Sequence, residues 1–208
     1  MTDRINDTKT APDKRDCQAG FTLIEFLIAS LILLIVAAGV FKMLSEIQSA
    51  ASRQAEVQSV LNNARIAIQT VERYVRQAGN DPLRSGFAGI TIVSASEVQI
   101  RSDRTGSSGA SKGDPDGDVD DSGENITIRY NRQSQSLQVV PYQGPAQIVA
   151  NHISDLSMEY YNAEGVPTTS GNEVRRITIT ISGSTPYPDP DTHQHFGLRL
   201  SENIRILT

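Results

Sequence analysis

Residues 21–41 read FTLIEFLIASLILLIVAAGVF, and this stretch decides the fold. Every residue in it is apolar or small except Glu25. A helix of about 21 residues rises roughly 31 Å, which matches the hydrocarbon core of a bilayer. The stretch therefore predicts one membrane-spanning helix. Its carboxylate needs an explanation, because an acidic side chain deep in a bilayer costs about 2.5–3.5 kcal/mol and is uncommon there without a partner.

The small residues Ala19 and Gly20 stand immediately before this apolar run. An ordinary secretory signal is cleaved after its apolar segment, so the segment is lost from the mature protein. Cleavage at Gly20 would instead leave the helix attached to the chain. A short polar leader of residues 1–20 is therefore predicted, and it contains Cys17, the single cysteine of the sequence. The mature chain would have no thiol for a disulfide or a metal site.

The order Gly20, Phe21, Thr22, Leu23, Ile24, Glu25, followed by a long apolar helix, resembles the class III signal of type IV prepilins and type II secretion pseudopilins. The resemblance implies that a prepilin peptidase cleaves between Gly20 and Phe21 and methylates the new amino group of Phe21. It also implies that Glu25 pairs with an amino-terminal charge during assembly. Physical chemistry agrees, because a buried carboxylate recovers its desolvation cost only against an opposite charge. The alternative is a plain signal anchor that contains a glutamate.

After Phe41 the helical pattern continues, but it becomes amphipathic. Apolar residues recur at alternating spacings of four and three, which is typical of a helix that packs on a sheet. Gly79 and Pro82 supply a stop signal, so the helix is predicted to run from Phe21 to Ala78. The predicted apolar stripe consists of Val57, Leu61, Ala64, Ile68, Val71, Val75 and Ala78, with Val60, Ala67 and Tyr74 beside it.

From Phe87 onward the apolar period changes to two, as expected for half-buried strands. One long helix on an antiparallel β-sheet gives an α+β class. We expect a leader (1–20), a transmembrane helix (21–41), its amphipathic continuation (42–79) and a β-rich domain (80–208). A short helix over Gln147–Ile153 is also considered. The predicted strands are 89–93, 97–101, 126–130, 137–140, 155–161, 175–182 and 195–206.

Two longer segments refine the resemblance. LNNARIAIQTVERYVRQAGND (61–81) and LRLSENIRILT (198–208) resemble minor pilins of the PilW type and the related J-type minor pseudopilins. The resemblance implies the type IV pilin fold and a structural subunit that helps to initiate or assemble a type IV pilus. It implies an inner-membrane protein with a periplasmic domain that later enters a fibre, with other pilins, the prepilin peptidase and the assembly platform as partners. A type II secretion pseudopilin and a fibre-tip adhesin or binding module are the alternatives.

The net charge of −5 is concentrated in one loop, residues 113–125. Six acidic residues in this loop contribute −6, so the rest of the chain sums to +1. Closely spaced carboxylates in a loop suit calcium, although the spacing is not that of an EF-hand. The candidate calcium ligands are Asp114, Asp116, Asp118, Asp120 and Glu124. A solvated acidic hairpin loop is the alternative.

No catalytic motif emerges from the sequence, so we expect a structural protein and not an enzyme. Nucleic-acid binding is not predicted either, because the charge pattern shows no basic face. Aromatic residues make up 5% of the chain and Trp is absent, which leaves few platforms on which bases could stack.

Overall fold

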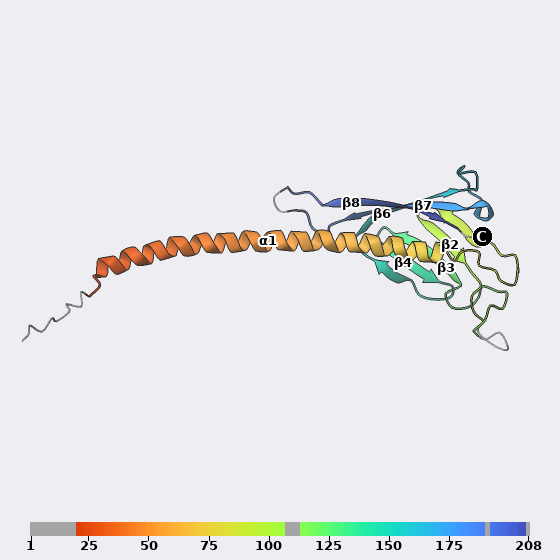
Figure 1. Ribbon diagram of the computed structural model, residues 1–208, viewed down its shortest axis with the longest axis horizontal. Coiled ribbons are helices and arrows are strands. Elements are labelled where there is room, and N and C mark those ends of the chain that lie inside the picture. The colour runs from red at the N-terminus through yellow and green to blue at the C-terminus, as the bar shows by residue number, and fades with distance from the viewer. Residues whose placement is uncertain (1–19, 107–112, 190–191, 207–208) are drawn as a thin grey trace, which may run out of the picture. The chain divides into compact units, whose positions relative to one another are not determined.

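The computed structural model describes residues 20–106, 113–189 and 192–206 (Figure 1). Residues 1–19 of the predicted leader, including Cys17, lie outside this description. The chain divides into two compact units, Met1–Ser49 and Ala50–Thr208, which are described separately. One helix, α1 (Leu23–Val75), contributes residues to both units.

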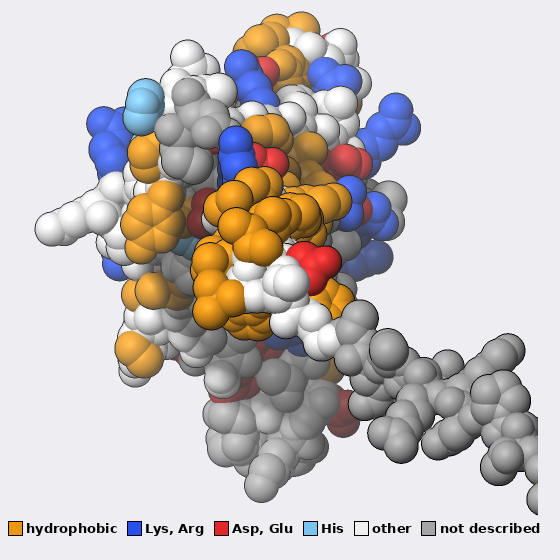
Figure 2. Space-filling model, turned by 90° about the vertical axis from the view of Figure 1, so that its left-hand side faces the viewer, with side chains coloured by type: hydrophobic (Ala, Val, Ile, Leu, Met, Phe, Trp, Pro, Cys, Tyr) orange, Lys and Arg blue, Asp and Glu red, His pale blue; other side chains and the backbone are white. Residues whose placement is uncertain are grey.

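In the first unit, α1 contains a segment that is long and apolar enough to cross a membrane, and none of that segment is buried within the chain. Phe21 is 87% exposed, and Leu31 and Leu34 are 59% and 67% exposed. Figure 2 shows hydrophobic side chains gathered at the N-terminal end of the helix. An apolar surface of this size is not stable in water, so this unit needs lipid or other helices around it.

In the second unit, α1 buries one row of small and β-branched side chains: Val60, Ala64, Ala67, Val71 and Val75 are all 0% exposed. The predicted stripe was centred slightly wrongly, because Val57, Leu61 and Ile68 are only partly buried. Alanine side chains at the middle of the contact let the helix backbone approach the strands closely, whereas larger residues fit at its margins.

Both ends of α1 differ from the prediction by two or three residues. The helix begins at Leu23 instead of Phe21 and ends at Val75 instead of Ala78. At its C-terminal end, the amides of Gln77 and Ala78 bond to carbonyls three residues earlier, so the last turn tightens. Gly79 then adopts φ 74°, a left-handed conformation that stops the helix.

The second unit contains two antiparallel sheets where a single sheet was expected. The α+β class itself is confirmed, with α1 packed on these sheets (Figure 1). A five-stranded sheet has the order β1-β2-β3-β4-β5, and a three-stranded sheet has the order β6-β7-β8. The strands are β1 (Ile90–Ser94), β2 (Glu97–Arg101), β3 (Asn125–Asn131), β4 (Ser136–Pro141), β5 (Gln147–Ala150), β6 (Ile153–Tyr161), β7 (Arg176–Ser184) and β8 (Gly197–Arg205), with a 3₁₀ turn η2 (Gly171–Glu173) before β7.

Two local predictions were wrong. The segment considered as a short helix, Gln147–Ile153, contains strand β5, which pairs with β4. Its Ile148 and Val149 are β-branched and favour a strand once an edge is available for pairing. The last strand begins at Gly197 and not at His195, because the Phe196 amide bonds to the Thr185 hydroxyl at 3.1 Å instead of to a strand carbonyl. The His195 ring bonds through Nδ1 to the Thr185 carbonyl at 2.7 Å.

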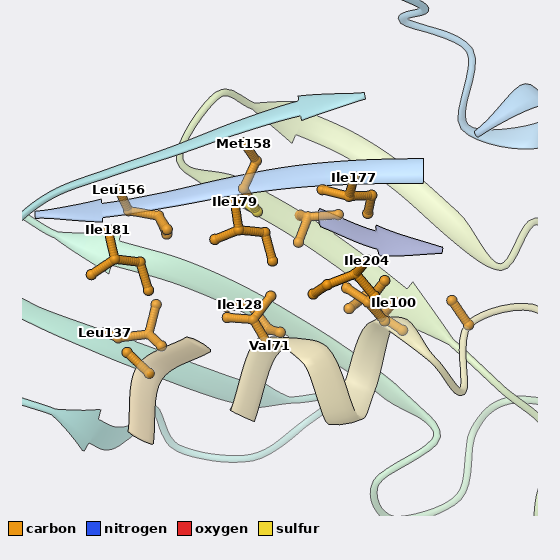
Figure 3. Packing of buried hydrophobic residues seen from close by; sticks show 14 of the residues in the cluster. Val71, Ile100, Ile128, Leu137, Leu156, Met158, Ile177, Ile179, Ile181 and Ile204 are labelled. Carbon is orange, nitrogen blue, oxygen red and sulfur yellow. The ribbon is translucent and has the colours of Figure 1, made fainter. Parts of the chain in front are cut away.

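The core lies between the two sheets and α1. Ile177, Ile179 and Ile181 of β7 are 0% exposed and, in Figure 3, point toward Val71 of α1 and Ile128 of β3. The alternation predicted for this strand is therefore confirmed. The residues between these isoleucines point to the outer face of the three-stranded sheet, where Thr178 donates a 2.6 Å hydrogen bond to Asn203 of β8.

Candidate functional site

The first candidate site is the beginning of α1, where Thr22 precedes the first helical residue, Leu23. The Thr22 amide donates a 2.9 Å hydrogen bond to Glu25 Oε2, and the Thr22 hydroxyl donates a second bond of 2.9 Å to the same atom. The Glu25 amide is 3.3 Å from the Thr22 hydroxyl oxygen. This reciprocal arrangement is a capping box, with Thr at the N-cap and Glu three residues later.

The capping box supplies a local reason for Glu25 that sequence reasoning missed, although the spacing Thr22-x-x-Glu25 was visible. The first amides of a helix lack partners and carry partial positive charge, so a carboxylate there is favourable. Only Oε2 of Glu25 is used in these bonds. Oε1 has no hydrogen-bond partner among the described residues, so it can accept a bond from a second donor.

The surroundings of this carboxylate are apolar and exposed. Leu23, Ile24 and Phe26 are 78%, 64% and 69% exposed, and the next charged residue along the helix is Lys42. Residues 15–41, which contain this arrangement, match the family model described as the prokaryotic N-terminal methylation motif. The protein is type IV pilin-like. The motif implies processing by a prepilin peptidase and assembly with other pilins.

The match is confined to the N-terminal segment, and no curated protein matches this pilin-like chain. Gly20 is the first described residue, and a Cβ added to it would meet no atom within 4 Å. Gly20 and Phe21 are both exposed and precede the helix, so the predicted scissile bond lies in accessible, non-helical backbone.

The second candidate site is the acidic loop, which is held in place by a buried carboxylate outside it. Asp103 is 0% exposed and accepts hydrogen bonds from the amides of Asp116 at 3.2 Å and Gly117 at 2.9 Å. Its own backbone amide and carbonyl bond to Asn80. The acidic loop is thereby anchored to the turn that follows α1. Sequence reasoning missed Asp103, because nothing in its local pattern marks it as a loop anchor.

The structure brings together only part of the predicted calcium set. Carboxylate oxygens of Asp116, Asp118 and Asp121 lie within 4.8 Å of one another and could hold a metal ion. Among the described residues, this group includes neither Asp114 nor Asp120. Asp121 was absent from the predicted set, although it is adjacent to Asp120 in the same acidic segment.

Glu124, the remaining predicted ligand, has a different position. It is 1% exposed, and its Oε1 accepts hydrogen bonds from the amides of Arg104 at 2.6 Å and Thr105 at 2.7 Å. Glu124 therefore stabilises the strand exit after β2. It does not belong to the described group of three aspartates.

The aspartate group has one feature that points to a missing partner. Asp121 Oδ2 is buried and has no hydrogen-bond partner within the described structure. An unpaired buried carboxylate oxygen is costly, and a bound cation would remove that cost. Calcium takes six to eight oxygen ligands, so three carboxylates with backbone carbonyls or water would suit it.

Proposed function

We propose that this protein is a minor pilin, a structural subunit that helps to initiate or assemble a type IV pilus, and that it has no catalytic role. The observation that carries the proposal is the beginning of α1. The exposed apolar segment of this helix, up to Phe41, carries one carboxylate, Glu25, which is fixed by the residue that follows the predicted methylation site. Such a helix serves as a membrane anchor first and as a fibre-core element afterwards.

In the proposed mechanism, α1 inserts into the inner membrane with its β-rich domain in the periplasm. A prepilin peptidase cleaves between Gly20 and Phe21 and methylates Phe21. The helix then leaves the bilayer and joins a bundle of similar helices. This transfer exchanges one apolar environment for another, so the hydrophobic contribution nearly cancels. Close packing and the pairing of Glu25 with an amino-terminal charge then decide whether the subunit is retained.

The intact mass of the membrane-extracted protein tests the first step. The protein is produced with active prepilin peptidase and, as the control, with an inactive peptidase. A species that begins at Phe21 and carries one added methyl group is expected only with the active enzyme. A chain that still carries its leader despite active peptidase would contradict the proposal and leave a plain signal anchor.

A second experiment separates a pilus from a type II secretion pseudopilus, the alternative within the same structural class. The gene is deleted in its host, and surface pili and secreted enzymes are measured in parallel. Loss of pili with normal secretion is the expected result. Loss of secretion with normal pili would instead identify a minor pseudopilin. If the protein is a fibre-tip binding module, deletion of its gene would leave both pili and secretion intact and would abolish adhesion alone.

We also propose a calcium ion on the acidic loop, with Asp116, Asp118 and Asp121 as its carboxylate ligands. The buried, unpartnered Asp121 Oδ2 supports this set. Calcium should raise the melting temperature of the full-length protein in detergent. Asp121→Asn should abolish this rise. Asp120→Asn removes the same charge from a neighbouring exposed residue outside the group and should leave the rise intact. Equal responses of the two variants would contradict the proposed ligand set.

A further inference from the structure

Two arginines stand directly opposite each other at one end of the three-stranded sheet. The register pairs Arg176 of β7 with Arg205 of β8, and Tyr161 of β6 with Arg176. Residues paired across a ladder point to the same face of a sheet. Tyr161, Arg176 and Arg205 therefore form one row across the outer face, on the side away from the core isoleucines of β7.

The row borders an open pocket of about 350 Å³, which Asn162, Gly165 and Arg175 also line. The Arg176 guanidinium lies over the Tyr161 ring, 4.5 Å from its centroid, so its plane is fixed by stacking. Arg175 is held by hydrogen bonds from Nη1 to the carbonyl oxygens of Asn172 at 3.0 Å and Val174 at 2.9 Å. Two of the three guanidinium groups are thus positioned before any ligand arrives.

The positive charge of this pocket is not neutralised within the described structure. None of Arg175, Arg176 and Arg205 forms an ion pair there. Arg176 Nε is buried and has no hydrogen-bond partner. Like charges directly opposite each other on a sheet are destabilising, so the pairing of Arg176 with Arg205 carries a cost that an anion would remove.

Two acidic residues close to this end of the sheet in the sequence, Glu159 and Glu164, do not fill this role. Glu159 Oε2 accepts a 2.7 Å hydrogen bond from the Tyr161 hydroxyl, and this bond raises the pKa of the tyrosine. One oxygen of Glu159 is thus bonded to the tyrosine, and Glu159 forms no ion pair with the three arginines within the described structure. Glu164 is exposed in the adjoining turn and forms no ion pair with these arginines.

We propose that Arg175, Arg176 and Arg205 form a binding site for a tetrahedral oxyanion, a phosphate or sulfate group. Guanidinium groups bind such anions through charge-assisted, frequently bidentate hydrogen bonds. The opposed side chains of Arg176 and Arg205, together with Arg175 in the pocket lining, favour a dianion over a singly charged carboxylate. The Asn162 side chain is a further donor at the rim, because its oxygen accepts from the Val166 amide at 2.8 Å and its NH₂ group forms no bond within the described structure. The site lies in the second unit and is independent of the methylation motif.

Calorimetric titration of the full-length protein in detergent micelles tests the site. Sodium phosphate, sodium sulfate and sodium acetate are added separately at constant ionic strength, with chloride as the balancing anion. The Arg205→Gln variant is compared with Arg199→Gln, a matched control because Arg199 lies on the same strand and outer face but outside the pocket. Both residues are exposed, so neither substitution removes core packing.

Phosphate and sulfate should bind the wild-type protein and Arg199→Gln with the same affinity, and acetate should bind more weakly. The affinity of Arg205→Gln for both dianions should be lower by a factor of about ten or more, since it loses a charge-assisted bond and one of three positive charges. Absence of phosphate binding, or equal phosphate affinities of the two variants, would overturn the proposal. Acetate binding as tight as phosphate binding would overturn the assignment to a tetrahedral dianion.

Discussion

Glu25 can act in two physically different ways, and a set of three substitutions separates them. As a helix cap, its carboxylate accepts hydrogen bonds from the Thr22 amide and hydroxyl at 2.9 Å each. As an assembly residue, its charge would pair with an amino-terminal ammonium group. Glu25→Gln keeps a hydrogen-bond acceptor but removes the charge. Thr22→Ala weakens the cap but keeps the charge, and Glu25→Ala removes both.

The magnitudes of the two effects differ enough to be distinguished. Loss of an N-cap interaction costs about 0.5–2 kcal/mol. Removal of one partner from a buried charge pair costs about 3–5 kcal/mol. Since about 1.4 kcal/mol corresponds to a factor of ten in an equilibrium constant, loss of the pair should reduce incorporation by more than about 100-fold. Loss of the cap alone should reduce incorporation by about 30-fold at most.

The assay measures the amount of subunit in sheared fibres relative to the amount of processed subunit in membranes. If charge pairing governs assembly, Glu25→Gln and Glu25→Ala should be nearly absent from fibres, whereas Thr22→Ala should remain clearly detectable. Ser30→Ala is the control, because Ser30 lies in the same span and its hydroxyl donates a 2.9 Å hydrogen bond to the Leu27 carbonyl of its own helix. Normal incorporation of Glu25→Gln, together with a strong defect in Thr22→Ala, would refute the charge-pairing argument.

Three further predictions concern the second unit, and two of them include a control variant. Ile179→Ala should lower the free energy of unfolding by about 2–5 kcal/mol in urea denaturation, because the side chain is 0% exposed, whereas Thr180→Ala on the opposite face of β7 should change it by less than about 1 kcal/mol. Asp103→Asn should cost about 1–3 kcal/mol and speed hydrogen exchange at the Gly117 amide, because an NH₂ group replaces one of the two oxygens that hold the loop. Gly171→Ala should lower the melting temperature, because its Cβ would overlap the Ile90 carbonyl, whereas Gly197→Ala, with no atom closer than 3.9 Å, should be tolerated.

The elements that were predictable from the sequence are those whose signals are local. The apolar run after Phe21 and the 3.6-residue period before Gly79 specify a helix wherever the rest of the chain lies. The alternation of isoleucine with polar residues in β7 likewise specifies a strand with one buried face. The α+β class follows from these two patterns, because each needs the other to cover its apolar surface.

The missed features depend on contacts between residues far apart in the chain. Division of the strands into two sheets requires knowledge of which strands pair, and β5 is a strand only because β4 offers it an edge. Asp103 anchors residues 13 and 14 positions further along the chain, so no local spacing identifies it. The opposed Arg176 and Arg205 could not be predicted either, because their pairing depends on the register of β7 with β8.

The capping box and the proposed charge pairing can use the same carboxylate in sequence. Thr22 occupies Oε2 of Glu25, and Oε1 has no hydrogen-bond partner among the described residues. Before cleavage, the nitrogen of Phe21 belongs to a neutral peptide bond and offers no charge. Cleavage after Gly20 would convert it into an ammonium group next to Thr22, and N-methylation would keep its positive charge. The cap would therefore hold Glu25 oriented beforehand, and processing would supply the cation for Oε1. The desolvation cost of a buried Glu25 carboxylate is offset only when the ammonium charge is also present. An unprocessed subunit should therefore remain in the membrane even with its cap intact.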